Sequence, residues 1–260
     1  QVRVDRGFDP ADHPAELRLD EFAFRFTPWS DGRLNLQAGQ FATVVGRWVT
    51  RHLSWQNPFI TAPLIYENPT RLSDLRPPPS PDYLAYPSGR QGYYYNPVIW
   101  GPSYATGFAA SGKAGSLEWA VELKNASLMS RPELWPIEDR QFDAPTLSAR
   151  LAWRPDPRWN VGLSGSTGSF AGESAAFADR HAYEQELVML DVSYAYRHLQ
   201  IWVEVARSTF RLPGFANDLE TFAWFVEGKL KLTPRLSVAA RLNEQRFFSY
   251  SAYGESIGSW

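Results

Sequence analysis

Apolar and polar residues alternate with a period of two along most of the chain after residue 14. Residues 117–124, in the order Leu-Glu-Trp-Ala-Val-Glu-Leu-Lys, show this most clearly. In an extended chain the large apolar side chains of this segment fall on one face and the charged ones on the other, whereas a helix would mix the two sets around its circumference. The alternation therefore predicts β-strands.

The same pattern predicts ten consecutive strands. They cover residues 17–26, 34–48, 106–113, 117–124, 147–154, 159–166, 188–196, 199–205, 222–232 and 236–245. In the first strand the apolar residues slip by one position near Asp20 and Glu21, and a β-bulge there would restore the register. The second strand is expected to run on to about Trp48.

Short and long connections alternate strictly between these strands. The short ones are 29–32, 113–115, 154–157, 197–198 and 233–235, and the long ones are 49–104, 128–145, 168–184, 211–219 and the residues after 248. A soluble β-sandwich has irregular loop lengths and Greek-key crossings. Short turns at one end and long loops at the other are typical of an outer-membrane barrel with periplasmic turns. We therefore expect residues 1–260 to form one all-β, antiparallel, up-and-down transmembrane β-barrel domain.

Composition excludes several other classes. The chain has 26 Lys and Arg against 28 Asp and Glu, and no cysteine. A nucleic-acid partner is not expected, because such binders carry a basic excess, and disulfide scaffolds and cysteine-ligated zinc are excluded. No apolar run approaches the roughly 18–20 residues of a transmembrane helix, and the N-terminal residues do not read as a signal peptide.

The aromatic residues favour a membrane over a watery exterior, although the charged face alone would fit either. Some aromatic residues lie beside the short turns (Trp29, Trp153, Trp159, Tyr194 and Tyr196), and others lie toward the long loops (Trp48, Phe210, Phe222, Trp224 and Phe247). Rings at both strand ends are typical of the girdles of a membrane barrel. The alternative is that they are core residues of a soluble protein.

The polar face of the strands would then line a lumen. The predicted pore-lining residues are Arg18, Arg25, Glu118, Glu122, Lys124, Arg150, Arg154, Asp191, Glu204, Glu227, Lys229 and Arg241. With Glu16, Asp20, Glu21 and Lys231 this face carries equal numbers of acids and bases, which argues against strong ion selectivity. The pattern leaves open whether these charges pair or line opposite walls.

The strand count predicts a larger barrel. Five hairpins with periplasmic turns would leave residues 1–14 and 249–260 both outside the cell, whereas such barrels keep both termini in the periplasm. A ring of ten strands is also narrow for a diffusion pore. We therefore expect the chain to be part of a barrel of about twelve strands or more.

The long connection 49–104 holds half of the 20 prolines of the chain. A connection this long is uncommon unless it has a function. If it folds into the lumen, Arg51, Glu67, Arg71, Asp74 and Arg76 are the candidates to form a constriction with wall charges, selecting solutes by field and size. The alternative is an extracellular lid or a contact surface for a partner protein.

The stretch 32–41, Gly-Arg-Leu-Asn-Leu-Gln-Ala-Gly-Gln-Phe, resembles the early hairpin of bacterial outer-membrane porins. It is most similar to the broad porin O/P-like class, which contains the phosphate-selective porins. The local likeness covers some 20–40 residues. The resemblance implies a trimer-forming channel, but not phosphate selectivity, because the ladder of lysines and arginines of those porins is replaced here by a balanced set.

No catalytic or metal-binding motif emerges clearly from the sequence. His13, His52, His181 and His198 lack metal-ligand spacing, and no phosphate loop or nucleophile elbow is present. Asp179-Arg180-His181 has the Asp-x-His spacing of proteases resembling the omptins, which are ten-stranded outer-membrane barrels, but no acidic pair accompanies it. We therefore expect no cofactor, no metal and no enzymatic activity.

The sequence thus favours a porin-like channel in the outer membrane of a Gram-negative bacterium, passing small polar solutes or ions by passive diffusion. Its partners would be the lipid bilayer and small polar solutes, with a homotrimer or an envelope protein as a further partner. One alternative is a non-conducting structural or binding barrel docked to an envelope partner through 49–104. A weaker alternative is an omptin-like hydrolase.

Overall fold

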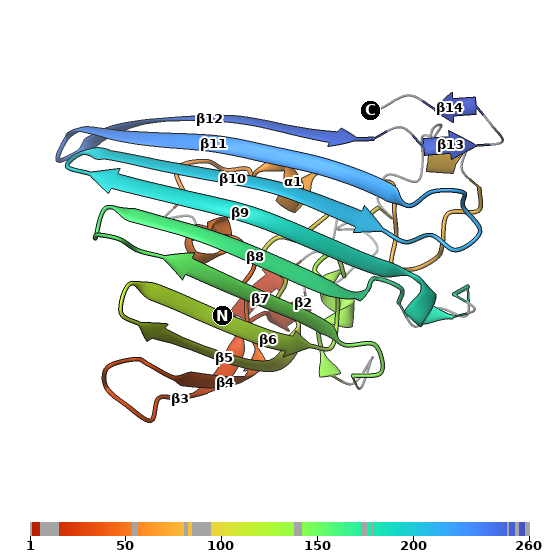
Figure 1. The fold of residues 1–260 in the computed structure, drawn as a ribbon, viewed down its shortest axis with the longest axis horizontal. Helices are drawn as coiled ribbons and strands as arrows, with labels where there is room; N and C mark the ends of the chain where they lie inside the picture. Colours follow the sequence, from red (N-terminus) through yellow and green to blue (C-terminus); the bar gives the residue numbers. More distant parts are fainter. Residues whose placement is uncertain are drawn as a thin grey trace.

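The computed structural model describes residues 2–5, 16–53, 57–80, 83–84, 95–137, 142–172, 176–177, 179–248, 250–252 and 255–257. Ten strands form one sheet in which each strand pairs antiparallel with the next along the chain (Figure 1). They are β3 (Phe22–Phe26), β4 (Asn35–Gln40), β5 (Thr106–Ala114), β6 (Leu117–Lys124), β7 (Thr146–Trp153), β8 (Trp159–Ser169), β9 (Glu184–Tyr196), β10 (Leu199–Phe210), β11 (Leu219–Thr233) and β12 (Leu236–Phe247). The predicted all-β, up-and-down fold is confirmed.

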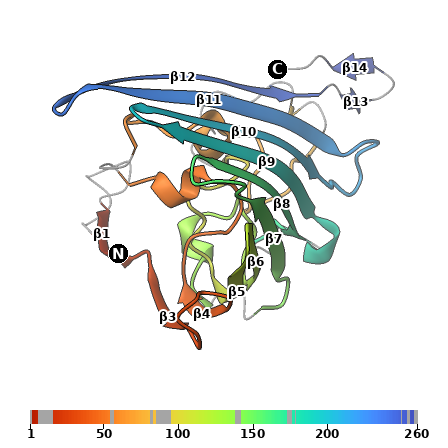
Figure 2. The ribbon, with the colours of Figure 1, turned by 60° about the vertical axis from the view of Figure 1, so that its left-hand side comes forward.

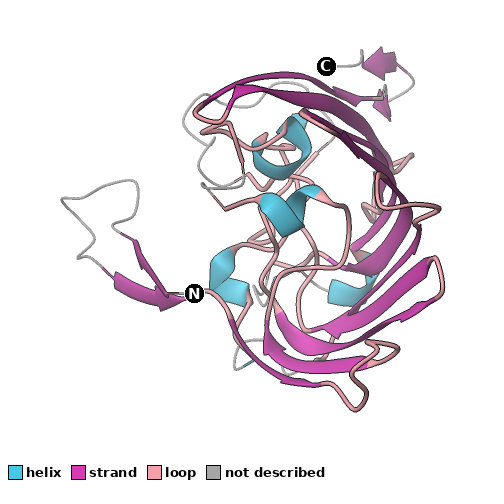
Figure 3. Ribbon diagram, turned by 90° about the vertical axis from the view of Figure 1, so that its left-hand side faces the viewer, coloured by secondary structure: helices cyan, strands magenta, loops and turns pink. Residues whose placement is uncertain are grey.

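The sheet curls into an open wall with β3 and β12 at its two edges (Figure 3). Within the described residues no strand pairs with the outer side of either edge. A barrel of about twelve strands or more therefore stays a prediction.

Two small hairpins stand outside the main sheet: β1 (Val2–Asp5) with β2 (Glu16–Leu19), and β13 (Tyr250–Ala252) with β14 (Glu255–Ile257). The bulge predicted near Asp20 is therefore wrong, because the chain leaves one sheet there and enters another. The Gln40 side chain donates to the carbonyl oxygens of Leu19 (3.2 Å) and Asp20 (3.0 Å), which fixes the chain at this junction.

The alternation of connections is confirmed. The short turns between strands gather at one end of the sheet and the long connections at the other (Figure 1). At the tight turn between β5 and β6, Gly115 has a φ of 61° with open space around its Cα, a conformation that glycine adopts without strain.

The convex face of the sheet is apolar and exposed. Its large side chains include Phe24, Phe108, Leu147, Leu151, Leu163, Val188, Val238 and Leu242, with exposed fractions from 49% to 73%. A soluble monomer rarely exposes such a continuous apolar surface, whereas a barrel wall presents one to lipid. The chain is therefore an outer-membrane β-barrel protein. No helix among the described residues is long and apolar enough to span a membrane.

The concave face is covered by the described parts of the connection between β4 and β5, which are residues 41–53, 57–80, 83–84 and 95–105 (Figures 2 and 3). This connection contains the 3-10 helix η1 (Trp48–Arg51) and the short helix α1 (Leu64–Glu67), and α1 contacts β11 and β12. Two further 3-10 turns among the described residues are η3 (Pro132–Leu134) and η4 (Arg180–Ala182). An apolar core forms where Val45, Trp48 and Ile65 pack with Met189 and Phe225 of the wall.

This core corrects half of the predicted aromatic girdle. At the turn end Trp29, Trp153 and Trp159 are exposed as expected. At the loop end, however, Trp48, Phe210 and Phe247 belong to the buried core under the connection. Alternation assigns a side chain to a face only in a strand, and Trp48 lies beyond the end of β4.

Candidate functional site

Residues 41–51, hereafter the crossing segment, run across the concave face from β6 toward β11. The Lys124 Nζ donates to the Phe41 carbonyl oxygen (2.5 Å) and to that of Ser103 (3.0 Å). The backbone N–H of Val44 then donates to Glu122 on β6 (3.1 Å), and that of Gly46 to the Ser164 hydroxyl on β8 (3.2 Å). Side chains of the wall thus bind the backbone of the crossing segment directly. The hydrogen bonds made by the charged side chains Lys124 and Glu122 are the stronger ones.

Glu204 on β10 holds the middle of the crossing segment. Its Oε1 accepts the backbone N–H groups of Arg47 and Trp48, both at 2.6 Å, and its Oε2 accepts the Tyr66 hydroxyl at 2.6 Å. Glu204 is buried, so these three donors replace the water that its carboxylate has lost. Burial and the neighbouring Glu204 carboxylate raise the pKa of Tyr66 well above its ordinary value.

Gly46 allows this close approach. Its φ is +75°, and a Cβ there would lie 2.5 Å from the Tyr66 hydroxyl oxygen and 2.8 Å from the Met189 sulfur. Only glycine fits the conformation and the space together.

Glu227 on β11 holds the far end of the crossing segment. It pairs with Arg51 and with Arg241 of β12, the second at 3.0 Å. The Arg51 guanidinium lies over the ring of Trp202 at 4.1 Å, a cation–π contact in a buried place. Arg241 also donates to the Thr61 carbonyl oxygen at 2.8 Å, so this cluster joins the connection to the edge strand.

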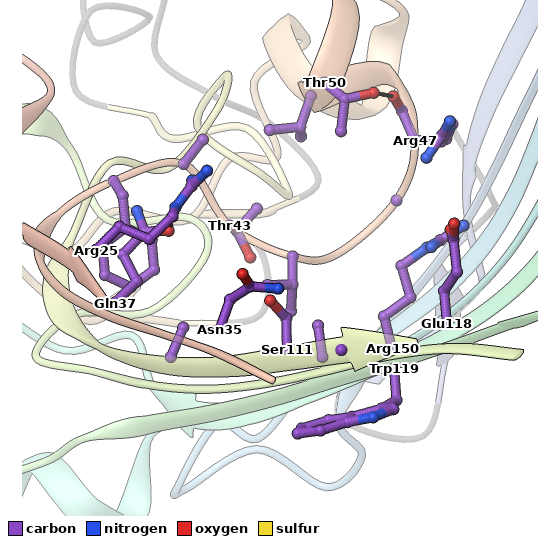
Figure 4. Close-up of a pocket in the computed structure, with 18 of the residues that line it drawn as sticks. Arg25, Asn35, Gln37, Thr43, Arg47, Thr50, Ser111, Glu118, Trp119 and Arg150 are labelled. Carbon is purple, nitrogen blue, oxygen red and sulfur yellow. Dashed lines mark hydrogen bonds between the residues drawn. The ribbon is translucent and has the colours of Figure 1, made fainter. Parts of the chain in front are cut away.

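A polar cavity of about 420 Å³ lies on the turn side of the crossing segment (Figure 4). Its charged lining residues are Glu21, Arg25, Arg47, Lys113, Glu118 and Arg150, and its polar ones include Asn35, Gln37, Thr43 and Ser111. A second cavity of about 190 Å³, between the wall and the turns, shares Arg47 with the first. Both cavities are lined by charged and polar groups as well as by apolar ones, so they offer water hydrogen-bond partners.

Most charges around the larger cavity are paired. Arg150 makes a bidentate bond to Asp191, at 2.6 and 3.0 Å, and also donates to Asn160. Glu118 accepts from Arg154 at 2.9 Å and lies 3.4 Å from Lys113. Arg25 donates to the Gln37 side chain at 3.0 Å.

The predicted wall residues and the predicted loop residues fare differently. Ten of them take part in the contacts above: Arg25, Glu118, Glu122, Lys124, Arg150, Arg154, Asp191, Glu204, Glu227 and Arg241. The side chain of Lys229 is half-buried and makes no hydrogen bond or ion pair with the described residues, and Arg18 lies in β2, outside the main sheet. Whether any of them lines a conducting path stays a prediction.

Of the predicted constriction residues, Arg51 reaches a charge of the wall, Glu227. Asp74 pairs with Arg131 of the connection 125–145 (2.7 Å), Glu67 accepts the Ala62 backbone N–H (2.8 Å), and the guanidinium groups of Arg71 and Arg76 contact Leu84 and Tyr83. These residues therefore stabilise the connections themselves. The residues that meet the wall, Thr43 to Trp48, were missed because the alternation was read as a strand through them.

The Asp-x-His triplet is a local turn. Asp179 accepts the backbone N–H of His181 at 3.0 Å and so caps η4, rather than orienting the imidazole. His181 is exposed. In the part of the chain that the structure describes, no three His, Asp or Glu side chains gather into a metal site.

Among known proteins, similarity to this chain is found with solved structures. No protein-family model matches the chain, and no curated protein does. Among solved structures, the chain is similar to the in-vitro folded, trimeric form of OmpT, an outer membrane protein of Vibrio cholerae. The TM-score is 0.42 and the identity 8%, over 88% of this chain and 72% of the other.

One expectation needs correction. We expected no enzymatic activity from the sequence, but the lack of a recognised catalytic motif does not exclude such an activity. The exclusion of a hydrolase therefore does not stand, and hydrolysis is tested below beside transport. The match itself assigns no activity to this chain, and the assignment to the outer membrane rests on the apolar convex face.

Proposed function

We propose that this protein is a channel that lets small polar solutes or ions diffuse through the outer membrane past a fixed constriction. The wall is the ten-stranded sheet, and the constriction is the crossing segment with the connection behind it. The cavity at the turn end would then be the vestibule on the periplasmic side. No chemical step is needed, because size and field at the constriction do the selection.

The observation that carries this proposal is the attachment of the crossing segment to the wall through buried charged groups. Lys124, Glu122, Glu204 and Glu227 hold it at successive positions across the concave face. A segment held at so many points narrows the space beside the wall without moving as a lid. The polar cavity next to it provides room for water and small solutes that a packed core would not provide.

Planar-bilayer recording of the full-length protein tests the proposal. We expect discrete conductance steps in symmetric KCl. A matched recording of protein denatured before reconstitution controls for detergent leaks. Absence of steps from folded, reconstituted protein would contradict the channel.

A second candidate is a non-conducting barrel that binds an envelope partner through 49–104. The apolar core favours it, because Val45, Trp48, Ile65 and their neighbours fill the loop end of the concave face. It requires that the protein show no conductance in bilayers and that pull-downs from detergent-solubilised membranes recover a stoichiometric partner. The remaining candidate, a hydrolase, requires peptide cleavage that is lost in His181→Ala.

A further inference from the structure

Arg47 differs from the other charged residues of the cavity, because its guanidinium has no hydrogen bond or ion pair with the described residues. It lines both polar cavities, and Figure 4 shows it at the larger one. Arg150, by contrast, is neutralised by Asp191, and Lys113 and Arg154 share Glu118. Beside a polar cavity, Arg47 is therefore a positive charge that makes no direct hydrogen bond or ion pair with an acid of the described residues.

The backbone of Arg47 is fixed although its side chain is free. Its N–H donates to Glu204 at 2.6 Å, and its carbonyl oxygen accepts the Thr50 N–H at 3.2 Å and the Thr50 hydroxyl at 2.8 Å. Because the backbone of Arg47 is already fixed, little backbone conformational entropy is lost when the side chain binds a ligand. Its placement is thus pre-organised.

The acids around Arg47 have other partners. Glu118, one of the two acids that line the same cavity, already accepts from Arg154, lies near Lys113 and accepts from Asn160, and Glu21, the other, interacts electrostatically with Lys124. Asp191 already accepts hydrogen bonds from the Nε and Nη2 atoms of Arg150. Burial, with a smaller contribution from the Arg150 charge, lowers the pKa of Arg47 from its ordinary value, although guanidinium stays protonated at neutral pH.

We propose that Arg47 binds small anions in this cavity and that it gives the channel a preference for anions. The preference of the channel for anions rests on the proposed channel function. Guanidinium binds carboxylate and phosphate oxygens through paired N–H donors, and halides by charge. The preference would come from one unpaired residue, although the wall as a whole is balanced in charge.

Reversal potentials in a KCl gradient test the preference. A unit charge about 7 Å from an ion in water changes the ion's local concentration by roughly threefold, so we expect the chloride-to-potassium permeability ratio to fall by about threefold or more in Arg47→Gln. Arg47→Lys should keep most of the preference. Arg33→Gln, which removes the same charge from an exposed turn residue paired with Asp31, should leave the ratio unchanged. An unchanged ratio in Arg47→Gln would overturn the preference.

Bromide in crystals of the full-length protein tests the site without any conductance. We expect an anomalous peak within hydrogen-bond distance of the Arg47 guanidinium, lost in Arg47→Gln and kept in Arg33→Gln. A wild-type crystal without that peak would overturn the site. If the peak is present while bilayers stay silent, the anion site stands and the channel fails, so the two failures are distinguishable.

Discussion

At the scale of single residues, the contact between Tyr66 and Glu204 joins a loop side chain to a buried wall carboxylate. The hydroxyl donates to Glu204 Oε2 at 2.6 Å, in a place closed to water. A hydrogen bond to a charged group contributes about 1.5–3 kcal/mol to stability, and losing it here leaves a buried oxygen one donor short.

We predict that Tyr66→Phe lowers the free energy of unfolding by about 2 kcal/mol. Urea unfolding of the reconstituted full-length protein measures it at neutral pH. Tyr196→Phe is the matched control, because Tyr196 is exposed at the turn end. Equal stability of the two variants would contradict the role given to the Tyr66 hydroxyl.

The raised pKa of Tyr66 also predicts a pH dependence. Below about pH 10, folded and unfolded chains both keep the phenol proton. Above it the unfolded chain releases the proton while the folded chain retains it, so stability falls as the pH rises. We expect the wild type to lose more stability than Tyr66→Phe between pH 8.5 and about 11. Parallel losses in the two proteins would count against burial of the neutral phenol.

Gly46 provides a second test at this scale. Gly46→Ala adds a Cβ against Tyr66 and Met189 at a positive φ, and we predict a loss of roughly 2–4 kcal/mol in unfolding free energy. Gly214→Ala is the control, because Gly214 has a φ of +87° but open space around it, and should cost only about 1 kcal/mol. Similar losses for both substitutions in urea unfolding would show that the space at Gly46 does not matter.

At the scale of elements, β11 carries two acids with different tasks. Glu227 is buried between Arg51 and Arg241, whereas Glu220 pairs with Arg207 at the surface (2.7 Å). Removing one partner of a buried ion cluster costs about 3–5 kcal/mol, and an exposed pair contributes about 0–1 kcal/mol. We predict losses of these sizes in Glu227→Gln and Glu220→Gln, measured by urea unfolding. Equal losses would mean that the Arg51 cluster does not anchor the crossing segment.

The strands were predictable from the sequence because their pattern is local. The alternation in 117–124 or 199–205 reflects one face toward lipid and one face toward the interior. It does not depend on which particular residues pack against either face. The end of β4 was not predictable, since residues 41–48 keep a rough alternation. What ends the strand is capture of its backbone by Glu122 and Glu204, which lie far along the chain. Gly46 was the one local signal of a break.

The candidate site was predictable only as a set of wall charges. Glu122, Lys124, Glu204 and Glu227 were found because they fall on the polar face of strands. Apart from Arg51, their partners on the connection were not found, because no periodicity links Thr43 or Arg47 to a given strand. The question whether wall charges pair could not be answered from face counting, and the structure shows pairs such as Arg150 with Asp191.

At the scale of the whole molecule, the convex face must lie in lipid. Leu163, in the middle of β8, is 56% exposed on that face. We predict that Leu163→Arg destabilises the reconstituted protein by about 2–4 kcal/mol, the cost of a charge facing lipid. Ser237→Arg, exposed on the polar face of β12, should cost much less. Unfolding from lipid vesicles measures both, and tolerance of Leu163→Arg would argue against the membrane assignment.

In the proposed channel, solutes pass the polar cavity beside the crossing segment. The sequence has no cysteine, so Ser111→Cys places one thiol in the cavity wall and Leu163→Cys places one on the convex face. Single-channel recording during addition of a charged thiol reagent is the most direct measurement. We predict a stepwise fall in current for Ser111→Cys and no fall for Leu163→Cys. An unchanged current in modified Ser111→Cys would contradict a path through this cavity.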